Sequence, residues 1–240
     1  MSYFFGLLLL TSLPVEQFQR ANRLYEAGQF QEAVVLYDSA LKFLAAAEIY
    51  YNRGNAHFKL GELGYAMADY LRAAALKPHD PDIKNNIVFV RNFRLDKNPN
   101  PESPITAFLR TIFTPFPFLT TRLLMGVMFF LLALSIAIFL ATGRRWFGYG
   151  VIGLAVVFLY FGVATVVGRG IVNRSKAVVV VPEAILRSGP GEEYKEIVAV
   201  HDGLEVKILG ERPGYFLIQI PGGVGGWVED RAMERVFGQL

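Results

Sequence analysis

The chain has 240 residues, 53% of them hydrophobic, and its mean hydropathy is positive. It contains no cysteine, which excludes disulfides, thiolate catalysis and cysteine-based metal sites. The formal net charge is only +3, the arginines gather around the most apolar segments, and the C-terminal part is acidic. A nucleic-acid-binding surface needs a basic stripe, so this distribution of charge excludes nucleic acid as a partner.

Residues 1–13 form an apolar stretch that is too short to cross a bilayer as a helix. Its length is typical of the hydrophobic region of an export signal, although no Lys or Arg precedes it and no small-x-small cleavage site follows. We interpret it as a signal-like segment. The alternative is a hydrophobic helix that packs on the following domain or lies in the membrane surface.

Residues 14–95 contain an internal repeat with a period of roughly 33 residues. When Gly28 is aligned with Gly61, the two copies share small, amide and aromatic positions: Ala21 and Gly54, Asn22 and Asn55, Ala33 and Ala66, Tyr37 and Tyr70, Ala40 and Ala73. This pattern resembles the tetratricopeptide repeat, a hairpin of two helices. Asp80 and Pro81 then have the N-cap and first-turn chemistry of a further helix. We expect two helical hairpins and a capping helix.

The inner face of such an array is lined by the first helix of each hairpin. The candidate partner-binding residues on this face are apolar side chains and amides, with one lysine: Phe18, Asn22, Tyr25, Tyr51, Asn52, Asn55, Phe58 and Lys59. Apolar residues flanked by amides suit a peptide or helix that is held by packing and side-chain hydrogen bonds. The alternative is that the aromatic residues belong to the core, which leaves the asparagines as the more informative positions.

Tetratricopeptide domains that hold a C-terminal carboxylate use Lys and Arg on this face. The matching positions here are Phe18, Tyr51 and Asp82, so that clamp is not expected. Arrays of this kind usually have three or more repeats, because two bury little surface. Either the capping helix suffices, or a partner completes the stack.

Residues 96–118 are predicted to be a Pro-rich linker followed by an interfacial segment. The prolines of residues 96–104 (DKNPNPESP) disfavour helix and extend the chain. Residues 105–118 combine several phenylalanines with Arg110, which is typical of a segment at the lipid–water boundary. The alternative is a loop that packs against the repeats.

Residues 119–169 are predicted to form a transmembrane helical hairpin. Two uncharged apolar runs, 123–141 and 146–168, flank a short turn. Each has about the 20 residues that a helix needs to cross the hydrocarbon core of a bilayer. The alternative is a very apolar soluble hairpin. Neither run contains the Asp, Glu, Lys or His of an ion or proton pathway, so the pattern does not favour a transporter.

The flanking charges disagree about the orientation of this hairpin. Arg144 and Arg145 favour a cytoplasmic turn, whereas Arg122, Arg169 and Arg174 favour the opposite orientation. An export signal would override that balance by delivering the repeats across the membrane first. In either orientation two crossings place the repeats and the C-terminal domain on the same side, provided that residues 1–13 do not span.

Residues 176–240 consist of short β-rich runs separated by Gly, Pro and Asp turns. The spaced motifs ILRSGPG (185–191), DG (202–203) and GWV (226–228) resemble the bacterial SH3-like barrel, a small interaction module. Tyr194, Tyr215 and Trp227 are the candidate aromatic groove for a peptide or a cell-wall glycopeptide. For Trp227 the alternative is a structural ring that closes the barrel.

No catalytic, cofactor or metal site is predicted, and we expect a protein that is not an enzyme. His57, His79 and His201 are scattered and lack the spacing of metal ligands. The glycine-rich run 221–226 lies between two strands rather than before a helix, so it predicts a hairpin turn and not a phosphate-binding loop.

The order of these parts, together with residues 60–91, resembles the tetratricopeptide-repeat member of the bacterial aerotolerance (Bat) operon family. The resemblance implies an inner-membrane protein with two spans and both soluble parts in the periplasm. It also implies that the protein works beside von Willebrand A-domain membrane proteins and a MoxR-type ATPase, in a system linked to stress tolerance and envelope maintenance. The weak signal-like segment departs from that family.

The expected fold class is therefore a multidomain membrane protein with all-α tetratricopeptide hairpins, two transmembrane helices and a C-terminal all-β SH3-like barrel. Its expected function is that of a scaffold or adaptor. The repeats would bind a protein segment, the barrel would bind a second peptide or the wall, and the hairpin would contact the lipid bilayer. The alternative is a peptidoglycan-binding sensor or activator of a cell-wall hydrolase.

Overall fold

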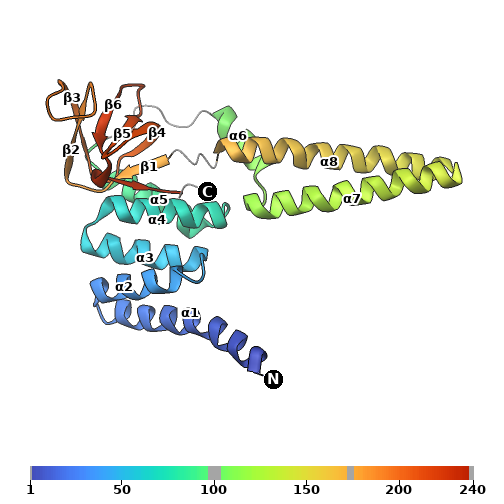
Figure 1. The fold of residues 1–240 in the computed structure, drawn as a ribbon, viewed down its shortest axis with the longest axis horizontal. Helices are drawn as coiled ribbons and strands as arrows, with labels where there is room; N and C mark the ends of the chain where they lie inside the picture. The colour runs from blue at the N-terminus through green and yellow to red at the C-terminus, as the bar shows by residue number, and fades with distance from the viewer. Residues whose placement is uncertain (1, 97–103, 172–175, 238–240) are drawn as a thin grey trace. The chain divides into compact units, whose positions relative to one another are not determined.

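The computed structural model describes residues 2–96, 104–171 and 176–237, and the chain divides into two compact units. The first, here called the helix–sheet unit, comprises Met1–Pro101 and Arg174–Leu240. It therefore joins the N-terminal helices to the C-terminal strands. The second, here called the apolar unit, comprises Glu102–Asn173. Figure 1 shows the helices and strands of both.

Five helices form the helical part of the helix–sheet unit, as the repeat predicts. They are α1 (Ser2–Glu26), α2 (Phe30–Leu41), α3 (Ala47–Leu60), α4 (Leu63–Leu76) and α5 (Pro81–Phe93). Gly28 and Gly61 follow α1 and α3 with φ of +77° and +81°, which favours glycine at both turns. Helix α1 continues through Pro14, so residues 2–13 of the signal-like segment belong to the same helix as the first repeat.

The repeated small and aromatic positions form the core between these helices. They are at most 2% exposed in both α2 and α4: Ala33, Tyr37, Ala40, Ala66, Tyr70 and Ala73. A Cβ atom at Gly54 would lie 2.8 Å from Cε1 of Tyr70, so α3 and α4 approach too closely there for a larger residue. The shared small and aromatic positions of the two repeats are confirmed as the places where the helices pack against each other.

Helix α5 begins where the sequence predicts. Asp80 is its N-cap, and the carboxylate accepts hydrogen bonds from the N–H groups of Asp82 (3.0 Å) and Ile83 (3.3 Å). Pro81 occupies the first turn, where the missing N–H costs no helical hydrogen bond. The start of the capping helix is therefore determined by the neighbouring residues Asp80 and Pro81.

The C-terminal part is a seven-stranded antiparallel sheet with the order β3-β2-β6-β5-β4-β1-β7. Its elements are β1 (Lys176–Val179), β2 (Glu183–Arg187), β3 (Glu196–His201), β4 (Glu205–Arg212), β5 (Tyr215–Gln219), β6 (Gly225–Glu229), the short 3-10 helix η1 (Asp230–Ala232) and β7 (Met233–Arg235). Among the described strands β3 and β7 are edges, so this sheet is open, whereas the sequence predicts a closed barrel. Val200 of β3, Ile218 of β5 and Met233 of β7 share one buried cluster, so the sheet curls around a single core.

The sheet packs on the last helices of the array (Figure 1). Val178 of β1 and Val236 belong to the same buried cluster as Met67 of α4 and Ile87 of α5. Phe237 packs against that cluster. The two repeats and the capping helix therefore do not end in solvent, because the chain's own sheet completes the stack.

The sheet approaches the helices most closely at the start of α4. A Cβ atom at Gly64 would overlap the carbonyl oxygen of Val179 and lie 2.9 Å from Cα of Val180. Only glycine leaves room for strand β1 at this point of the helix. Gly64 is thus required by a tertiary contact and not by its own helix, where glycine lowers stability.

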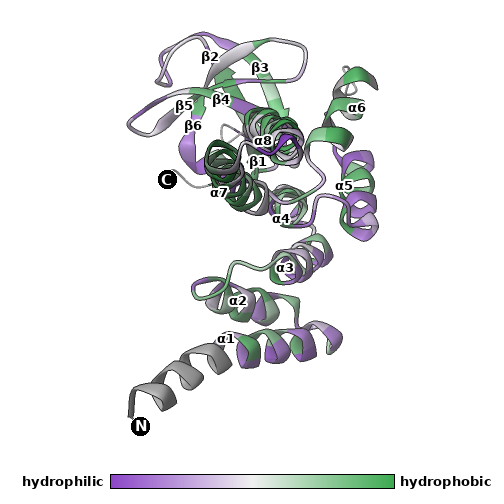
Figure 2. Ribbon diagram, turned by 90° about the vertical axis from the view of Figure 1, so that its right-hand side faces the viewer, coloured by the Kyte–Doolittle hydropathy of each residue, from purple (hydrophilic) through white to green (hydrophobic). Residues whose placement is uncertain are grey.

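The apolar unit contains α6 (Pro104–Phe113), α7 (Phe118–Thr142) and α8 (Arg145–Ile171). By length and composition, Phe118–Thr142 and Arg145–Val167 can each cross a membrane. Only 0% and 11% of their most apolar windows are buried inside the protein, whereas the core helix of a soluble protein would be mostly buried. Figure 2 shows the hydrophobic colouring along α7. The two apolar helices are present as the sequence predicts, and their insertion into a membrane stays a prediction.

Helix α8 contacts both of the other helices of the apolar unit. A Cβ atom at Gly148 of α8 would lie 3.2 Å from Cε2 of Phe139, so a small residue lets α7 and α8 approach closely. The hydroxyl of Tyr160 in α8 donates a hydrogen bond to the carbonyl oxygen of Ile112 in α6 over 2.7 Å. Part of the predicted interfacial segment is therefore a short helix fastened to α8.

Candidate functional site

The predicted partner-binding residues of the repeats all lie on α1 and α3, the first helices of the two hairpins. Asn22 of α1 contacts Asn52 of α3, and Asn55 of α3 contacts Asn86 of α5. The first helices therefore follow one another along one side of the array, here called the amide face. The sequence analysis did not include Asn86 among the binding residues. Counting one repeat period of roughly 33 residues on from Asn55 reaches the part of α5 that contains it.

Equivalent hydrogen bonds recur along the amide face. Tyr37 Oη donates to Asn22 Oδ1 over 2.7 Å, and Asn52 Nδ2 donates to the same oxygen over 2.9 Å. One repeat later the set is Tyr70 Oη (2.7 Å) and Asn86 Nδ2 (2.9 Å), both donating to Asn55 Oδ1. Each asparagine oxygen thus joins a buried tyrosine to the next helix of the amide face, which is α3 for Asn22 and the capping helix α5 for Asn55.

Asn22 and Asn55 lie partly at the surface and also stabilise the fold. Tyr37 and Tyr70 are buried, and burial raises the pKa of both phenols. A buried hydroxyl that loses a hydrogen-bond partner destabilises the fold. Replacement of Asn22 or Asn55 by alanine therefore changes stability as well as the surface, which the sequence alone does not reveal.

The predicted aromatic residues of the first helices are half-buried. The ring of Phe18 lies 6.0 Å from that of Tyr37, and the ring of Tyr51 lies 5.9 Å from that of Tyr70. Tyr25 contacts Phe30 at 5.3 Å. Each of these rings packs against a buried cluster and is also partly exposed. The rings therefore contribute to the core on one side and to the surface on the other.

One aromatic cluster at the end of the amide face is largely exposed. The ring of Phe58 lies 5.4 Å from Phe89 and 5.8 Å from Phe93, and the last two are 4.7 Å apart. Phe89 and Phe93 are 49% and 57% exposed. Sequence reasoning missed both, although their spacing of four residues on a predicted helix places them on one side of it. Lys59 is exposed beside Phe58.

The sheet presents its candidate residues on the side opposite its core. Val228 of β6 is buried, and Trp227 beside it points the other way, with Leu217 of β5 and Arg187 of β2 as its cross-strand neighbours. Tyr215 shares the parity of Leu217. Trp227 therefore lies on the outer face of the sheet. Whether it lines a groove or serves as a structural ring stays a prediction.

Tyr194 is held close to this outer face by a loop contact. Arg187 Nη1 donates to the carbonyl oxygens of Glu192 and Tyr194, each over 3.2 Å. A Cβ atom at Gly189 would overlap the ring of Tyr194, so the ring rests on the backbone of the loop. Tyr194 is 42% exposed, so its ring is available to a ligand.

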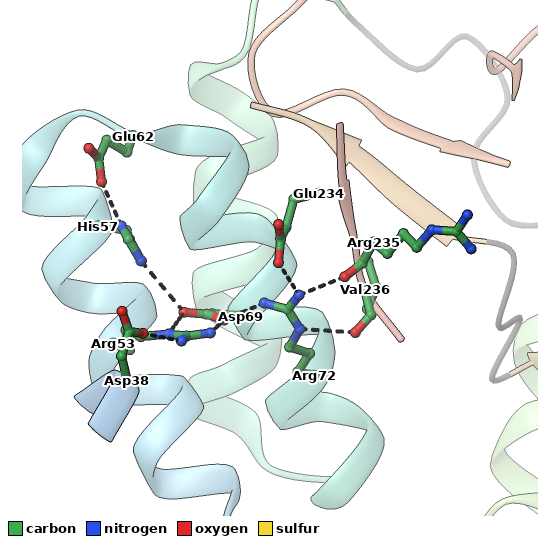
Figure 3. Close-up of polar contacts among 9 residues, drawn as sticks. All are labelled: Asp38, Arg53, His57, Glu62, Asp69, Arg72, Glu234, Arg235 and Val236. Atoms are coloured by element: carbon green, nitrogen blue, oxygen red, sulfur yellow. Dashed lines mark hydrogen bonds and ion pairs between the residues drawn. The ribbon is translucent and has the colours of Figure 1, made fainter. Parts of the chain in front are cut away.

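A chain of charged side chains connects the helices to the sheet (Figure 3). Asp69 of α4 is 1% exposed and accepts hydrogen bonds from Arg53 of α3 (2.7 and 2.6 Å) and Arg72 of α4 (2.8 Å). Arg53 also contacts Asp38 of α2, and Arg72 also contacts Glu234 of β7. Alternating charges therefore run from α2 to the last strand.

The same network reaches the backbone of the sheet. Arg72 donates to the carbonyl oxygens of Arg235 (2.6 Å) and Val236 (2.9 Å). His57 lies 4.0 Å from Asp69 (Figure 3). Within the described ranges, no group of three or more His, Cys, Asp or Glu could hold a metal ion. The arrangement fits a structural junction between helices and sheet, because the buried carboxylate of Asp69 is paired with Arg53 and Arg72.

A second set of polar contacts fastens α5 to the sheet. Arg91 donates to the carboxylate of Glu205 in β4 over 2.7 and 3.0 Å, and Asp96 accepts from the N–H of His201 over 2.7 Å. Arg94, which is 4% exposed, lies 3.5 Å from Glu205. Burial acts to raise the pKa of Glu205, but Arg91 and the neighbouring cations outweigh it and hold the pKa below its ordinary value.

Comparisons with known proteins identify the helical part. A family model described as "Tetratricopeptide repeat" matches residues 47–80, and one described as "TPR repeat" matches residues 21–61. The chain is 44% identical over 57 residues to Tetratricopeptide repeat protein 16 of Homo sapiens and of Macaca fascicularis, and 42% identical to that of Mus musculus. These matches cover 23% of this chain, and only 6% of the first two relatives and 7% of the third. The chain therefore carries tetratricopeptide repeats.

Proposed function

Because its helices are tetratricopeptide repeats, we propose that this protein is a non-enzymatic scaffold that binds protein partners along the amide face and is anchored in a membrane by α7 and α8. Repeats of this family generally bind protein partners. The observation that carries the proposal is the exposed cluster of Phe58, Phe89 and Phe93 at the end of the amide face. Clustered aromatic side chains on a surface are typical of sites where another protein is bound.

The membrane anchor is proposed because the rest of the protein leaves the apolar surface of α7 and α8 almost uncovered. Both helices are apolar along a length sufficient to span, and almost none of that surface is buried within the protein. Such a surface is stable in hydrocarbon and unstable in water. Since the helices and the sheet belong to one compact unit, the segment between them has to cross the membrane an even number of times.

The surroundings of the scaffold are proposed from the resemblance of the whole chain to the aerotolerance operon family. On this basis the protein lies in a bacterial inner membrane with its helix–sheet unit in the periplasm. Its partners there are von Willebrand A-domain membrane proteins of an aerotolerance or envelope-stress complex. The sheet is proposed to be an SH3-like domain, in which Tyr194, Tyr215 and Trp227 bind a second peptide.

Co-purification tests the proposal. The full chain, extracted in detergent, is expected to recover A-domain proteins from membranes of its own host. Replacement of Phe89 and Phe93 by serine is expected to abolish that recovery, whereas Phe43→Ser is the matched control, because Phe43 is 56% exposed in the turn after α2. Equal recovery by both variants would show that the amide face is not the binding site.

The outer face of the sheet favours a second candidate function, binding of peptidoglycan by a sensor or activator of a cell-wall hydrolase. Trp227 and Tyr215 share this face, and aromatic rings of this kind pack on both peptides and sugars. The full chain in detergent is then expected to sediment with purified sacculi, and Trp227→Ala is expected to stop it. Recovery of wall hydrolases alone in the co-purification would favour this function over the first.

A further inference from the structure

The two connections between the helix–sheet unit and the rest of the chain start close together within that unit. The structure describes the unit up to Asp96 and again from Lys176, the first residue of β1. Arg94, two residues before the first of these ends, lies 3.5 Å from the carboxylate of Glu205. Glu205 is the cross-strand partner of Val178, two residues after the second end. Both connections therefore start from one region of the unit. This region, here called the tether surface, comprises Arg91, Arg94, Leu95, Lys176 and Lys207.

Only short lengths of chain separate the tether surface from the candidate spans. Four residues, 172–175, lie between Lys176 and Ile171 at the end of α8. An extended chain of this length reaches at most about 18 Å. Seven residues, 97–103, lie between Asp96 and Pro104 at the start of α6. Because the proposed anchor places α8 in the membrane, these connections keep the tether surface within reach of the lipid headgroups.

Lys176 and Lys207 place two like charges opposite each other. They are cross-strand partners of the antiparallel pair β1–β4, so their side chains share one face of the sheet. Like charges in this arrangement are destabilising. The carboxylate of Glu205, diagonal to Lys176, is already hydrogen-bonded to Arg91. Among the residues that the structure describes, neither lysine forms an ion pair or a side-chain hydrogen bond. An anion from outside the protein would offset their repulsion.

Positive charge is in excess over the whole tether surface. Both of its arginines share Glu205, and Lys176 is close enough to attract the same carboxylate. Arg94 is 4% exposed, and its Nε and Nη1 atoms are buried without a hydrogen bond. Asp96 adds a second carboxylate and Lys207 a fourth cation. Four cations against two carboxylates favour an anionic ligand.

An exposed apolar side chain beside these cations favours a lipid as the source of the anion. Leu95 follows Arg94 directly and is 74% exposed. Basic side chains next to apolar ones are typical of surfaces that lie on a membrane, where the cations meet anionic headgroups and the apolar side chains enter the boundary of the acyl chains. A soluble anion such as free phosphate would use the cations alone and leave Leu95 in water.

We propose that the tether surface rests on the membrane and binds anionic lipid headgroups, with Lys176 and Lys207 at their phosphate groups and Leu95 at the boundary of the acyl chains. A phosphate between the two lysines offsets their repulsion, and the contact fixes the helix–sheet unit against the bilayer. This inference rests on the proposed membrane anchor and goes beyond it, because an anchor alone gives the unit no contact of its own with lipid.

The test measures the distance from the tether surface to the headgroups in the full chain, reconstituted in nanodiscs. The chain contains no cysteine, so Leu209→Cys, at a position that is 50% exposed two residues after Lys207, accepts a single fluorescent donor. The acceptor is a dye on the headgroup of a tracer lipid. Energy transfer is expected to be about twofold higher in discs of equal parts phosphatidylcholine and phosphatidylglycerol than in discs of phosphatidylcholine alone. The increase should vanish in about 1 M salt, where the screening length falls to about 3 Å.

Variants that neutralise charge assign the effect. Lys176→Gln combined with Lys207→Gln is expected to remove the increase in energy transfer, because both lysines contribute to attraction by the anionic surface. The double variant relieves the repulsion of two like charges, so it is not expected to unfold. Lys42→Gln combined with Lys195→Gln is the matched control. It removes the same charge from two exposed sites, after α2 and before β3, and the wild-type increase is expected.

The outcomes separate this inference from the proposed function. If the chain enters the discs but energy transfer is the same in both lipids, the lipid contact is overturned and the membrane anchor stands. If the control pair loses the increase as fully as Lys176→Gln with Lys207→Gln, the assignment to the tether surface is overturned. A chain that does not enter the discs contradicts both proposals.

An acidic protein is the other occupant that the test can detect. If energy transfer is independent of the lipid while Lys176→Gln with Lys207→Gln abolishes recovery of A-domain proteins, the tether surface binds a protein and the lipid contact is overturned. The comparison of lipids and of salt needs no charge variant, so loss of folding in a variant does not affect it.

Discussion

The carboxylate of Asp202 lies 2.9 Å from the backbone nitrogen of Gly64, although 138 residues separate them in the chain. A second hydrogen bond of 3.0 Å joins the same carboxylate to the N–H of Leu63. Glu62, which precedes α4, makes no side-chain cap of its own. The sheet therefore supplies the N-cap of a repeat helix, and the repeats and the sheet stabilise each other.

Replacement of Asp202 tests this cap. Burial raises the pKa of Asp202 despite the backbone hydrogen bonds it accepts, because a buried negative charge is unfavourable. The side chain therefore stabilises α4 as a hydrogen-bond acceptor rather than through its charge. Asp202→Ala is expected to lower the free energy of unfolding of the full chain by about 1 kcal/mol, the usual cost of a lost cap. Asp202→Asn retains an acceptor and is expected to be much milder in urea unfolding. An asparagine variant as unstable as the alanine variant would contradict the cap.

Gly64→Ala tests the close approach of strand and helix. Alanine is ordinarily better than glycine inside a helix, but here the added methyl would overlap the carbonyl oxygen of Val179. Overpacking of this kind is expected to cost about 1–3 kcal/mol. Gly210→Ala is the control, because its Cβ would meet only Leu217, at 3.8 Å. Urea midpoints of the two variants should differ clearly, and a stabilised Gly64→Ala would show that the sheet does not pack on α4.

Asp69→Asn tests the buried charge network. The variant leaves Arg53 and Arg72 without the carboxylate that they share. Loss of one partner from a buried ion pair is expected to cost about 3–5 kcal/mol. The exposed pair of Glu48 and Lys77 is the control, and Glu48→Gln is expected to leave the thermal midpoint nearly unchanged. Similar midpoints for both variants would mean that the network does not stabilise the junction.

The lowered pKa of Glu205 predicts how the stability of the contact between α5 and the sheet changes in acid. Because its pKa is lower in the folded protein than in the unfolded chain, its contribution is present above the unfolded value of about 4.3 and is lost as the pH falls through the folded value. The urea midpoint of the full chain should therefore fall below about pH 4.3. Glu205→Gln is expected to flatten that fall.

The matched control for acid is Glu192→Gln, an exposed glutamate in the loop before Tyr194. It should retain the pH dependence of the wild type. Asp202 acts in the opposite sense, because a raised pKa favours the folded state as the pH falls. A steeper acid loss in Glu205→Gln than in the wild type would contradict the role assigned to Glu205.

The absence of cysteine makes membrane topology directly measurable. Single cysteines at Gln29, Ser188 and Arg144 report on the helices, the sheet and the turn between α7 and α8, and all three positions are exposed. In sealed vesicles a membrane-impermeant maleimide should label Gln29→Cys and Ser188→Cys from one side and Arg144→Cys from the other. Labelling of all three from the same side would exclude the transmembrane hairpin.

Local features of this chain can be predicted from its sequence because short-range chemistry sets them. The N-cap at Asp80, the left-handed turns at Gly28 and Gly61, and the repeated packing of Tyr37 and Tyr70 each depend on residues within one repeat. The two apolar helices follow in the same way from an uninterrupted apolar composition. For the candidate site, the period of the repeat was enough to place Asn22 and Asn55 on one face.

Other features were decided only in three dimensions, because their partners lie far apart in the chain. The sequence predicted a barrel beside two short repeats, and the structure has an open sheet that caps α4 through Asp202 and completes the stack. It predicted asparagines available to a ligand, and the side-chain oxygens of Asn22 and Asn55 accept hydrogen bonds from buried tyrosines. By helix propensity alone, glycine at position 64 lowers the stability of α4. Only the strand that packs against it gives the reason for its presence.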